Sequence, residues 1–203
     1  MLLQHAFGDT GRAELVRRHG VFDPKKIARI ETQTSERALR HTDRPRPKSA
    51  LEAKFSVQYC VARALVHGEV VLDHFEGAAY DEPVIQDLLG RVQSSPYTGP
   101  FFSEADRFDA VLKLTLDDGS TVQTRVDAPL GRTVDSAIPV EALDAKFLDC
   151  ASRVLGASGA DRVRRRIWAI DEMESVRELT DMIEVPASET TMRIEAVRAA
   201  ETA

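Results

Sequence analysis

The segment 53–68, AKFSVQYCVARALVHG, constrains the fold of this chain more than any other stretch. Read as a helix, it carries one apolar stripe at i, i+3, i+4, i+7 and i+8 spacing and a second stripe beside it. The first stripe comprises Val57, Cys60, Val61, Ala64 and Leu65, and the second comprises Phe55, Tyr59, Ala62 and Val66. A helix that is apolar over most of its circumference packs against partners on more than one side. We therefore expect a buried central helix that ends at Gly68, as helices often end at a glycine.

Tyr59 lies between these stripes, and a buried tyrosine needs a hydrogen-bond partner for its hydroxyl group. The pattern alone favours a core tyrosine bonded to a backbone carbonyl, because most buried polar groups are simply satisfied. A functional tyrosine remains the alternative. The pattern of the segment leaves both interpretations open.

Composition places the chain among soluble globular proteins. Its 203 residues allow one domain or two small ones, and 43% are apolar and 30% charged. The net charge of −6 gives no basic field for nucleic acid or anionic lipid. No signal peptide or membrane-spanning run is visible, so we expect a cytoplasmic protein without nucleic-acid or membrane partners. Cys60 and Cys150 have no CxxC spacing, and we expect both to be buried free thiols.

Several segments before residue 138 predict a small sheet covered by helices. Residues 26–35 are rich in β-branched side chains and alternate, which predicts a strand. Residues 109–127 alternate on both sides of Asp118-Gly119, which predicts a hairpin with a tight turn. We expect residues 69–76 to be extended, Asp81 to cap a helix with Pro83 in its first turn, and residues 94–107 to be a loop. At least three strands with helices on one face make an antiparallel-rich α+β fold.

After residue 138 the pattern becomes purely helical. Apolar residues recur at helical spacing from Val140 to Ile183, and Gly156 ends the first of three expected helices. These helices cannot bury their faces on one another and need a further helical layer. We therefore predict a lid-like α+β domain over residues 1–137, returning helices of an incomplete helical domain over 138–183, and a disordered tail over 184–203.

Motifs for metals, nucleotides and nucleophilic serines are absent from the sequence, so no metal site or cofactor is expected. His67 and His74 are expected to be solvated rather than metal ligands. The proline-rich loop 41–49 contains Arg44, Arg46 and Lys48 and follows Arg40, and these basic residues are either solvated or an electropositive rim for an anionic ligand. The basic run 162–166, RVRRR, is either a solvated or interdomain helical face or a nucleic-acid patch, and the acidic balance favours the former.

One run of residues says more about function than composition and spacing do. Residues 44–68, RPRPKSALEAKFSVQYCVARALVHG, resemble the MmgE/PrpD family, which includes 2-methylcitrate dehydratases and cis-aconitate decarboxylases. The later motifs occur in a similar order too: Asp-Glu-Pro at 81–83, Asp-Asp-Gly at 117–119, a loop at Gly131 and Asp-Ala-Lys-Phe at 144–147. The similarity covers residues 10–182 and concerns only the C-terminal half of family members.

The resemblance implies a lyase that acts on small di- or tricarboxylates, as in 2-methylcitrate dehydration. Such chemistry needs a base, an acid and groups that stabilise developing charge. Tyr59 matches the lid tyrosine that reaches the family's active site, where it would bind substrate or donate a proton. Lys54 and Ser56 belong to the same run and would position the lid or bind substrate, and His5 matches a histidine near the family's domain junction.

The resemblance also implies partners. The family's other site residues belong to a helical N-terminal half, which would be a separate chain or is missing, and a homo-oligomer such as a dimer is expected. The absent half would also explain why the helix at 53–67 is apolar on two sides. The alternative is a non-catalytic remnant or interaction module that uses exposed apolar faces.

Overall fold

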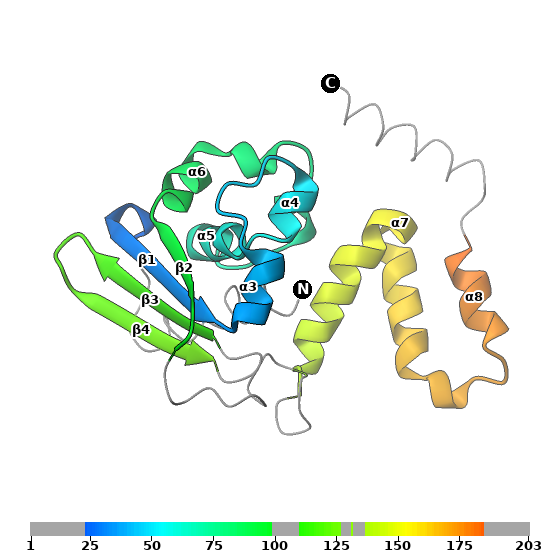
Figure 1. Cartoon of the computed structure of the whole chain (residues 1–203). Coiled ribbons are helices and arrows are strands. Elements are labelled where there is room, and N and C mark those ends of the chain that lie inside the picture. Colours follow the sequence, from blue (N-terminus) through cyan, green and yellow to red (C-terminus); the bar gives the residue numbers. More distant parts are fainter. Residues whose placement is uncertain (1–22, 99–109, 127–130, 132–136, 185–203) are drawn as a thin grey trace. The chain divides into compact units, whose positions relative to one another are not determined.

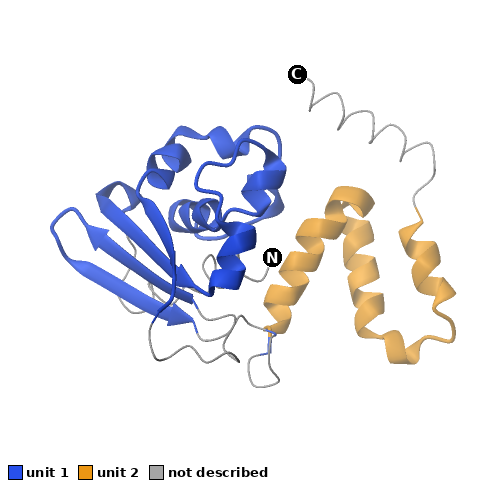
Figure 2. Ribbon diagram, viewed as in Figure 1, with its two compact units in different colours: residues 1–137 blue, residues 138–203 orange. Residues whose placement is uncertain are grey.

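The computed structural model describes residues 23–98, 110–126, 131 and 137–184. The chain divides into two compact units, Met1–Ala137 and Ile138–Ala203 (Figure 2). The described part of the first unit contains a four-stranded sheet with helices, and that of the second contains helices alone (Figure 1). The predicted α+β class with C-terminal helices is confirmed. The predictions for His5 and for the tail after residue 184 lie outside the described residues.

The sheet of the first unit has the strand order β2-β1-β3-β4. Its strands are β1 (Ile27–Thr34), β2 (Val92–Pro96), β3 (Ala110–Leu116) and β4 (Thr121–Val126). The β3–β4 hairpin is confirmed, with Gly119 in its turn at a φ of 82°. The prediction of a loop over 94–107 was wrong at its start, because β2 pairs parallel to β1 there. Polar β2 lies at the edge of the sheet, where a proline such as Pro96 is tolerated.

The alternation predicted for β1 is broken near its start. Simple alternation would place Ile27 and Ile30 on opposite faces, yet both are fully buried. The register of β1 against β3 shifts between Ile27 and Arg29, as at a β-bulge. An extra residue at a bulge changes which residues share a face, so both isoleucines join the core.

The helices of the first unit lie on one face of the sheet (Figure 1). They are η2 (Pro24–Lys26), α3 (Glu36–Thr42), α4 (Ala50–Lys54), α5 (Val57–His67), η3 (Leu72–Phe75), η4 (Ala79–Asp81) and α6 (Pro83–Leu89). The segment 53–68, which was expected to form one helix, is thus divided between the end of α4 and the whole of α5. Gly68 ends α5 in the left-handed conformation, as predicted. The extended segment predicted at 69–76 was wrong, because η3 forms there. The cap predicted at Asp81 was also wrong, since Glu82 precedes Pro83 at the start of α6.

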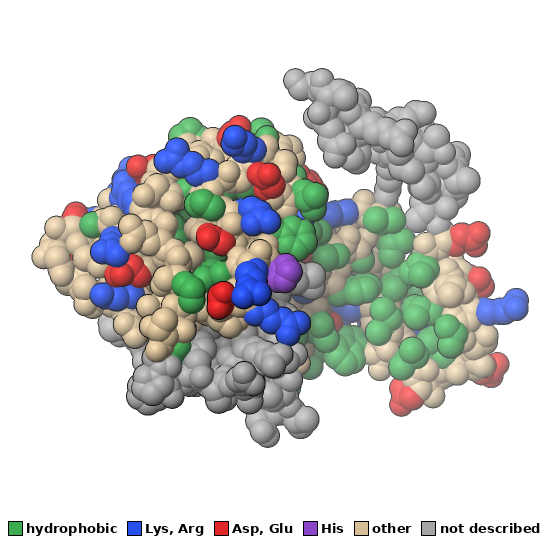
Figure 3. Space-filling model, in the orientation of Figure 1, with side chains coloured by type: hydrophobic (Ala, Val, Ile, Leu, Met, Phe, Trp, Pro, Cys, Tyr) green, Lys and Arg blue, Asp and Glu red, His purple; other side chains and the backbone are tan. Residues whose placement is uncertain are grey.

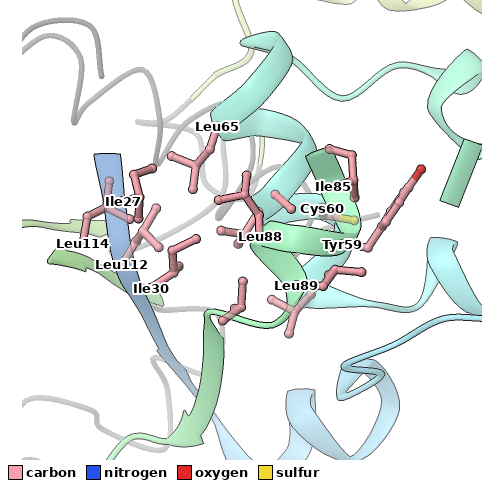
Figure 4. Close-up of a cluster of buried hydrophobic side chains, with 14 of the residues drawn as sticks. Ile27, Ile30, Tyr59, Cys60, Leu65, Ile85, Leu88, Leu89, Leu112 and Leu114 are labelled. Atoms are coloured by element: carbon pink, nitrogen blue, oxygen red, sulfur yellow. The ribbon is translucent and has the colours of Figure 1, made fainter. Parts of the chain in front are cut away.

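Helix α5 is the centre of the apolar core, and every residue from Val57 to Leu65 is buried. The core cluster combines α5 with Ile85 and Leu88 of α6 and with β1 and β3 (Figure 4). Two members of the second stripe, Tyr59 and Ala62, are fully buried in the core cluster of this unit, where Phe75 of η3 contacts the Tyr59 ring, so the inference that the whole stripe lacks a partner is corrected. Phe55 of the same stripe is 51% exposed.

The second unit, in contrast, has few buried side chains. Helix α7 (Val140–Trp168) is interrupted at Gly156, where φ is 69° and ψ is 163°, as the sequence predicted. The helices η6 (Ile170–Glu172) and α8 (Arg177–Ile183) follow. Only Ala160 and Val163 are buried among its described residues. The prediction that Cys150 is buried was wrong, since this thiol is exposed, whereas Cys60 is buried as expected.

The basic run 162–166 pairs with acidic side chains of its own unit. Arg164 contacts Asp144 and Asp161 at 2.5 and 2.8 Å, and Arg166 bonds Glu178 of α8. These partners agree with a solvated or structural face rather than a nucleic-acid patch. Within the described residues, no helix is both long and apolar enough to cross a membrane.

Candidate functional site

Ser56 lies directly before α5 and is its N-terminal cap. Its Oγ accepts a hydrogen bond from the Tyr59 backbone N–H at 3.0 Å and donates to the Arg44 carbonyl at 2.6 Å. A serine at this position satisfies an N–H group that the helix leaves unpaired. Ser56 therefore fixes the start of α5 and holds the preceding loop. Lys54 is an exposed residue at the end of α4, and His5 lies outside the described residues.

Tyr59 is fully buried, and its hydroxyl has two partners. The hydroxyl donates to the backbone carbonyl of His74 and accepts from Nε of Arg63 at 2.9 Å. Figure 4 shows the phenol oxygen directed away from the aliphatic side chains of the core. Burial raises the pKa of Tyr59, and the hydrogen bond from Arg63 offsets part of that rise. The His74 carbonyl alone would satisfy the hydroxyl group of a core tyrosine. The hydrogen bond from the Arg63 guanidinium is a second interaction, which a core tyrosine does not require.

Arg63 is the functional candidate that sequence reasoning missed. It is 2% exposed and donates from all three guanidinium nitrogens. Besides Tyr59, the acceptors are the Glu82 carboxylate, the Ala79 carbonyl and Nε2 of His67, the last at 2.8 Å. An arginine inside an apolar helix, four residues from both Tyr59 and His67, was the available signal, because residues at i and i+4 share a helix face. Buried charges require partners.

The two histidines expected to be solvated are part of this arrangement. The rings of His67 and His74 lie 4.8 Å apart between centroids. Nδ1 of His74 accepts a hydrogen bond from the Val71 backbone N–H at 3.2 Å. Because an arginine is only a donor, Nε2 of His67 acts as the acceptor of the Arg63 bond. We call Tyr59, Arg63, His67, His74 and Glu82 the Tyr59 cluster.

The Tyr59 cluster brings together the groups that general acid–base catalysis uses: a phenol, two imidazoles and a carboxylate. The guanidinium of Arg63 fixes the phenol, because it cannot accept a proton or a hydrogen bond. The proton of Tyr59 is thereby directed to the His74 carbonyl. No group of three or more metal-binding side chains occurs among the residues that the structure describes.

We expect His74 to make stability depend on pH. Burial, Arg63 and His67 lower the pKa of His74, while Asp73 and Glu82 act in the opposite direction. The unfolded chain therefore binds more protons below about pH 6.5, the ordinary histidine value. The contribution of His74 is complete above that pH, falls as pH drops through it, and levels off below the lowered pKa of the folded state.

The variant His74→Asn should show a smaller loss of unfolding free energy between pH 7.5 and pH 5, measured by urea denaturation. Asparagine can still accept the Val71 N–H bond but does not titrate. The control is His41→Asn, which changes an exposed side chain of α3 and should keep the slope of the unmodified chain. Equal slopes for all three proteins would contradict the assignment to His74.

Residues 11–172 match the MmgE/PrpD C-terminal domain family. The chain belongs to this family. The matched range includes the whole Tyr59 cluster and most of the described second unit. The resemblance inferred from residues 44–68 is therefore confirmed.

Among curated proteins, this MmgE/PrpD family member is similar to cis-aconitate decarboxylases. It is 26% identical to that of Mus musculus over 187 residues, which covers 83% of this chain and 38% of the relative. It is 24% identical to that of Homo sapiens, covering 87% and 36%, and 26% identical to a cis-aconitate decarboxylase-like protein of Aspergillus oryzae, covering 77% and 33%. The chain thus spans about a third of the length of the curated relatives it matches.

Proposed function

We propose that this chain is the C-terminal portion of an MmgE/PrpD-type lyase that acts on small di- or tricarboxylates. The observation that carries this proposal is the Tyr59 cluster, which groups a phenol, two imidazoles and a carboxylate within the region matched by the family. The favoured reaction is dehydration of a 2-methylcitrate-like substrate. Decarboxylation is the second candidate, because three relatives are named for cis-aconitate decarboxylation or likeness to it.

In this proposal Tyr59 binds a substrate oxygen or donates its proton to it. Dehydration breaks a C–H and a C–O bond, so a base takes the proton from carbon and an acid protonates the departing hydroxyl. Tyr59 serves as the donor once a substrate oxygen displaces the His74 carbonyl. Arg63 keeps the phenol in place during that exchange, and Ser56 positions it through the start of α5. Lys54 and His5 remain proposed substrate-binding residues.

The proposed partner is a helical N-terminal half that packs on the second unit. Large apolar side chains gather on the visible face of α7 and α8 (Figure 3). Those between 38% and 64% exposed in this unit are Val140, Leu143, Val154, Ile167, Trp168, Ile170, Val176 and Ile183. Such an apolar surface is typical of an interface. The relatives are more than twice as long as this chain and have additional residues that could cover it. A homo-oligomer is proposed as well.

Co-expression with a helical half encoded next to this chain tests the proposal. We expect a soluble complex that converts 2-methylcitrate or cis-aconitate, with the acids measured by chromatography. The variant Leu143→Ser should weaken the complex because it removes an exposed apolar contact on α7. The matched control Lys146→Ser, on the same helix, should not. Absence of both complex and turnover would refute the lyase proposal.

The second candidate function is a non-catalytic interaction module of the same fold. It is favoured by one observation: the Tyr59 hydroxyl and three guanidinium nitrogens of Arg63 already have partners within the chain. A stable complex that turns over none of the tested acids would support this candidate.

A further inference from the structure

The first unit contains an open cavity apart from the side chains of the Tyr59 cluster. It has a volume of about 310 Å³ and lies between the proline-rich loop, η4 and α6. Its lining residues are Arg46, Pro47, Lys48, Tyr80, Asp81 and Gln86. The cavity is therefore large enough for a small organic molecule, at the lower end of ligand-site volumes.

Two cations on one wall form no ion pair with an acidic side chain of the part of the chain that the structure describes. The ion pairs among the described residues include neither Arg46 nor Lys48. The exposed Arg40 and the half-buried Arg91 of this unit are paired with carboxylates, whereas the exposed Lys25, Lys26, Arg37 and Arg44 also occur in none of these ion pairs. A guanidinium and an ammonium that face the same cavity form a site for a carboxylate or another oxyanion. The electropositive rim that was one of the two alternatives for this loop in the sequence thus borders a cavity.

The loop that carries these cations is held in place. The Arg44 carbonyl accepts from Ser56, the Lys48 backbone N–H donates to Glu52 at 2.7 Å, and Asp43 accepts from Gln58 at 2.5 Å. Pro47 is buried and further restricts the backbone. A loop ordered before binding loses less conformational entropy when a ligand arrives.

The other wall has a different chemistry. Nε2 of Gln86 donates to the Tyr80 carbonyl at 2.7 Å, which ties α6 to η4. Asp81 adds an exposed carboxylate that can only accept hydrogen bonds when ionised. A ligand with carboxylates alone would be repelled at this end. A ligand that also has a hydroxyl group could donate to Asp81.

We propose that this cavity binds a small hydroxy acid, with a carboxylate between Arg46 and Lys48 and a hydroxyl group toward Asp81. This site goes beyond the proposed lyase function, because it needs neither a partner chain nor turnover. Its ligand makes no covalent bond. If the cavity binds no ligand, the result of the co-expression assay still tests the lyase proposal. If that assay fails, the cavity can still be tested for binding.

The test uses the full ¹⁵N-labelled chain in a buffer of low ionic strength without phosphate or carboxylate. The probe is malate, followed by backbone amide shifts. We expect saturable shifts at Lys48, Asp81 and Gln86 with a dissociation constant of about 1 mM, which is typical of weak sites with few contacts. Arg46→Gln and Lys48→Gln should each weaken binding about fivefold, and the double variant should abolish saturation.

The matched control is Arg37→Gln, which removes an exposed side chain of α3, changes the net charge equally outside the cavity and should leave binding within about twofold. These side chains are all exposed, so the variants should retain the spectrum of the folded chain. Equal weakening by Arg37→Gln, or equal binding of the neutral diamide of malate, would overturn the site. Equal binding of inorganic phosphate at the same residues would overturn its assignment to a hydroxy acid.

Discussion

In the proposed lyase complex, the variant Tyr59→Phe is expected to lower kcat by about 100-fold or more, the usual range for loss of a general acid or base. The ring and its contact with Phe75 at 5.7 Å between centroids are kept, so packing should change little. The substrate oxygen would lose its proton donor. The measurement is steady-state kinetics of the co-expressed complex with the acid that it converts.

Tyr59→Phe also has a structural effect that must be separated from catalysis. The His74 carbonyl loses its donor and Nε of Arg63 loses its acceptor, so we expect unfolding to need about 1–2 kcal/mol less free energy. The control Tyr97→Phe removes a hydroxyl just after β2 and should leave kcat unchanged. A Tyr59→Phe complex that keeps full kcat would assign the tyrosine to the core alone.

Arg63→Met is expected to cause a large loss of stability, about 3 kcal/mol in the free energy of unfolding. Breaking a buried ion pair typically costs about 3–5 kcal/mol, because the remaining charge is left unpaired. The lower end applies here since the side chain of Glu82 is 37% exposed and can be hydrated. A chain of about 200 residues should then melt about 6–12 °C lower. Urea denaturation and calorimetry measure both quantities.

Three further variants decide whether this loss comes from the network. Arg63→Lys should recover only part of the stability, because one ammonium cannot reach four acceptors placed around a planar guanidinium. Adding Glu82→Gln to Arg63→Met should cost less than the sum of the single changes, because the orphaned charge is removed. The control Arg40→Met breaks an exposed pair with Glu36 and should cost at most about 0.5 kcal/mol. A similar loss for Arg40→Met would contradict the network.

Local patterns predicted several elements well. The β3–β4 hairpin follows from alternation around Asp118-Gly119, and its register agrees with that alternation. The ends of α5 at Gly68 and of the first α7 segment at Gly156 follow from the positive φ that glycine readily adopts. Burial of α5 follows from its two apolar stripes. These features depend on interactions between residues close in sequence.

Other elements depended on distant residues. The short strand β2 has a polar sequence and exists because β1 offers it backbone partners about 62 residues away, as the pairing of Thr32 with Ser94 illustrates. The Thr32 hydroxyl also donates to the Ser94 hydroxyl at 2.7 Å. The bulge that places Ile27 and Ile30 on one face is set by pairing with β3. No local pattern specifies either feature.

The candidate site likewise has some residues that the sequence identified and others that only the tertiary structure brought together. By itself, the sequence determined the family and singled out Tyr59, because a long run of side chains is shared at fixed spacing. Only the tertiary structure showed that His74, Ala79 and Glu82 fold over this helix, where Tyr59 and Arg63 bind them. The physical reason is that a buried arginine takes its partners from whichever backbone and side chains fold over it. These partners lie 15 to 19 residues away in the chain, beyond the reach of any helical periodicity.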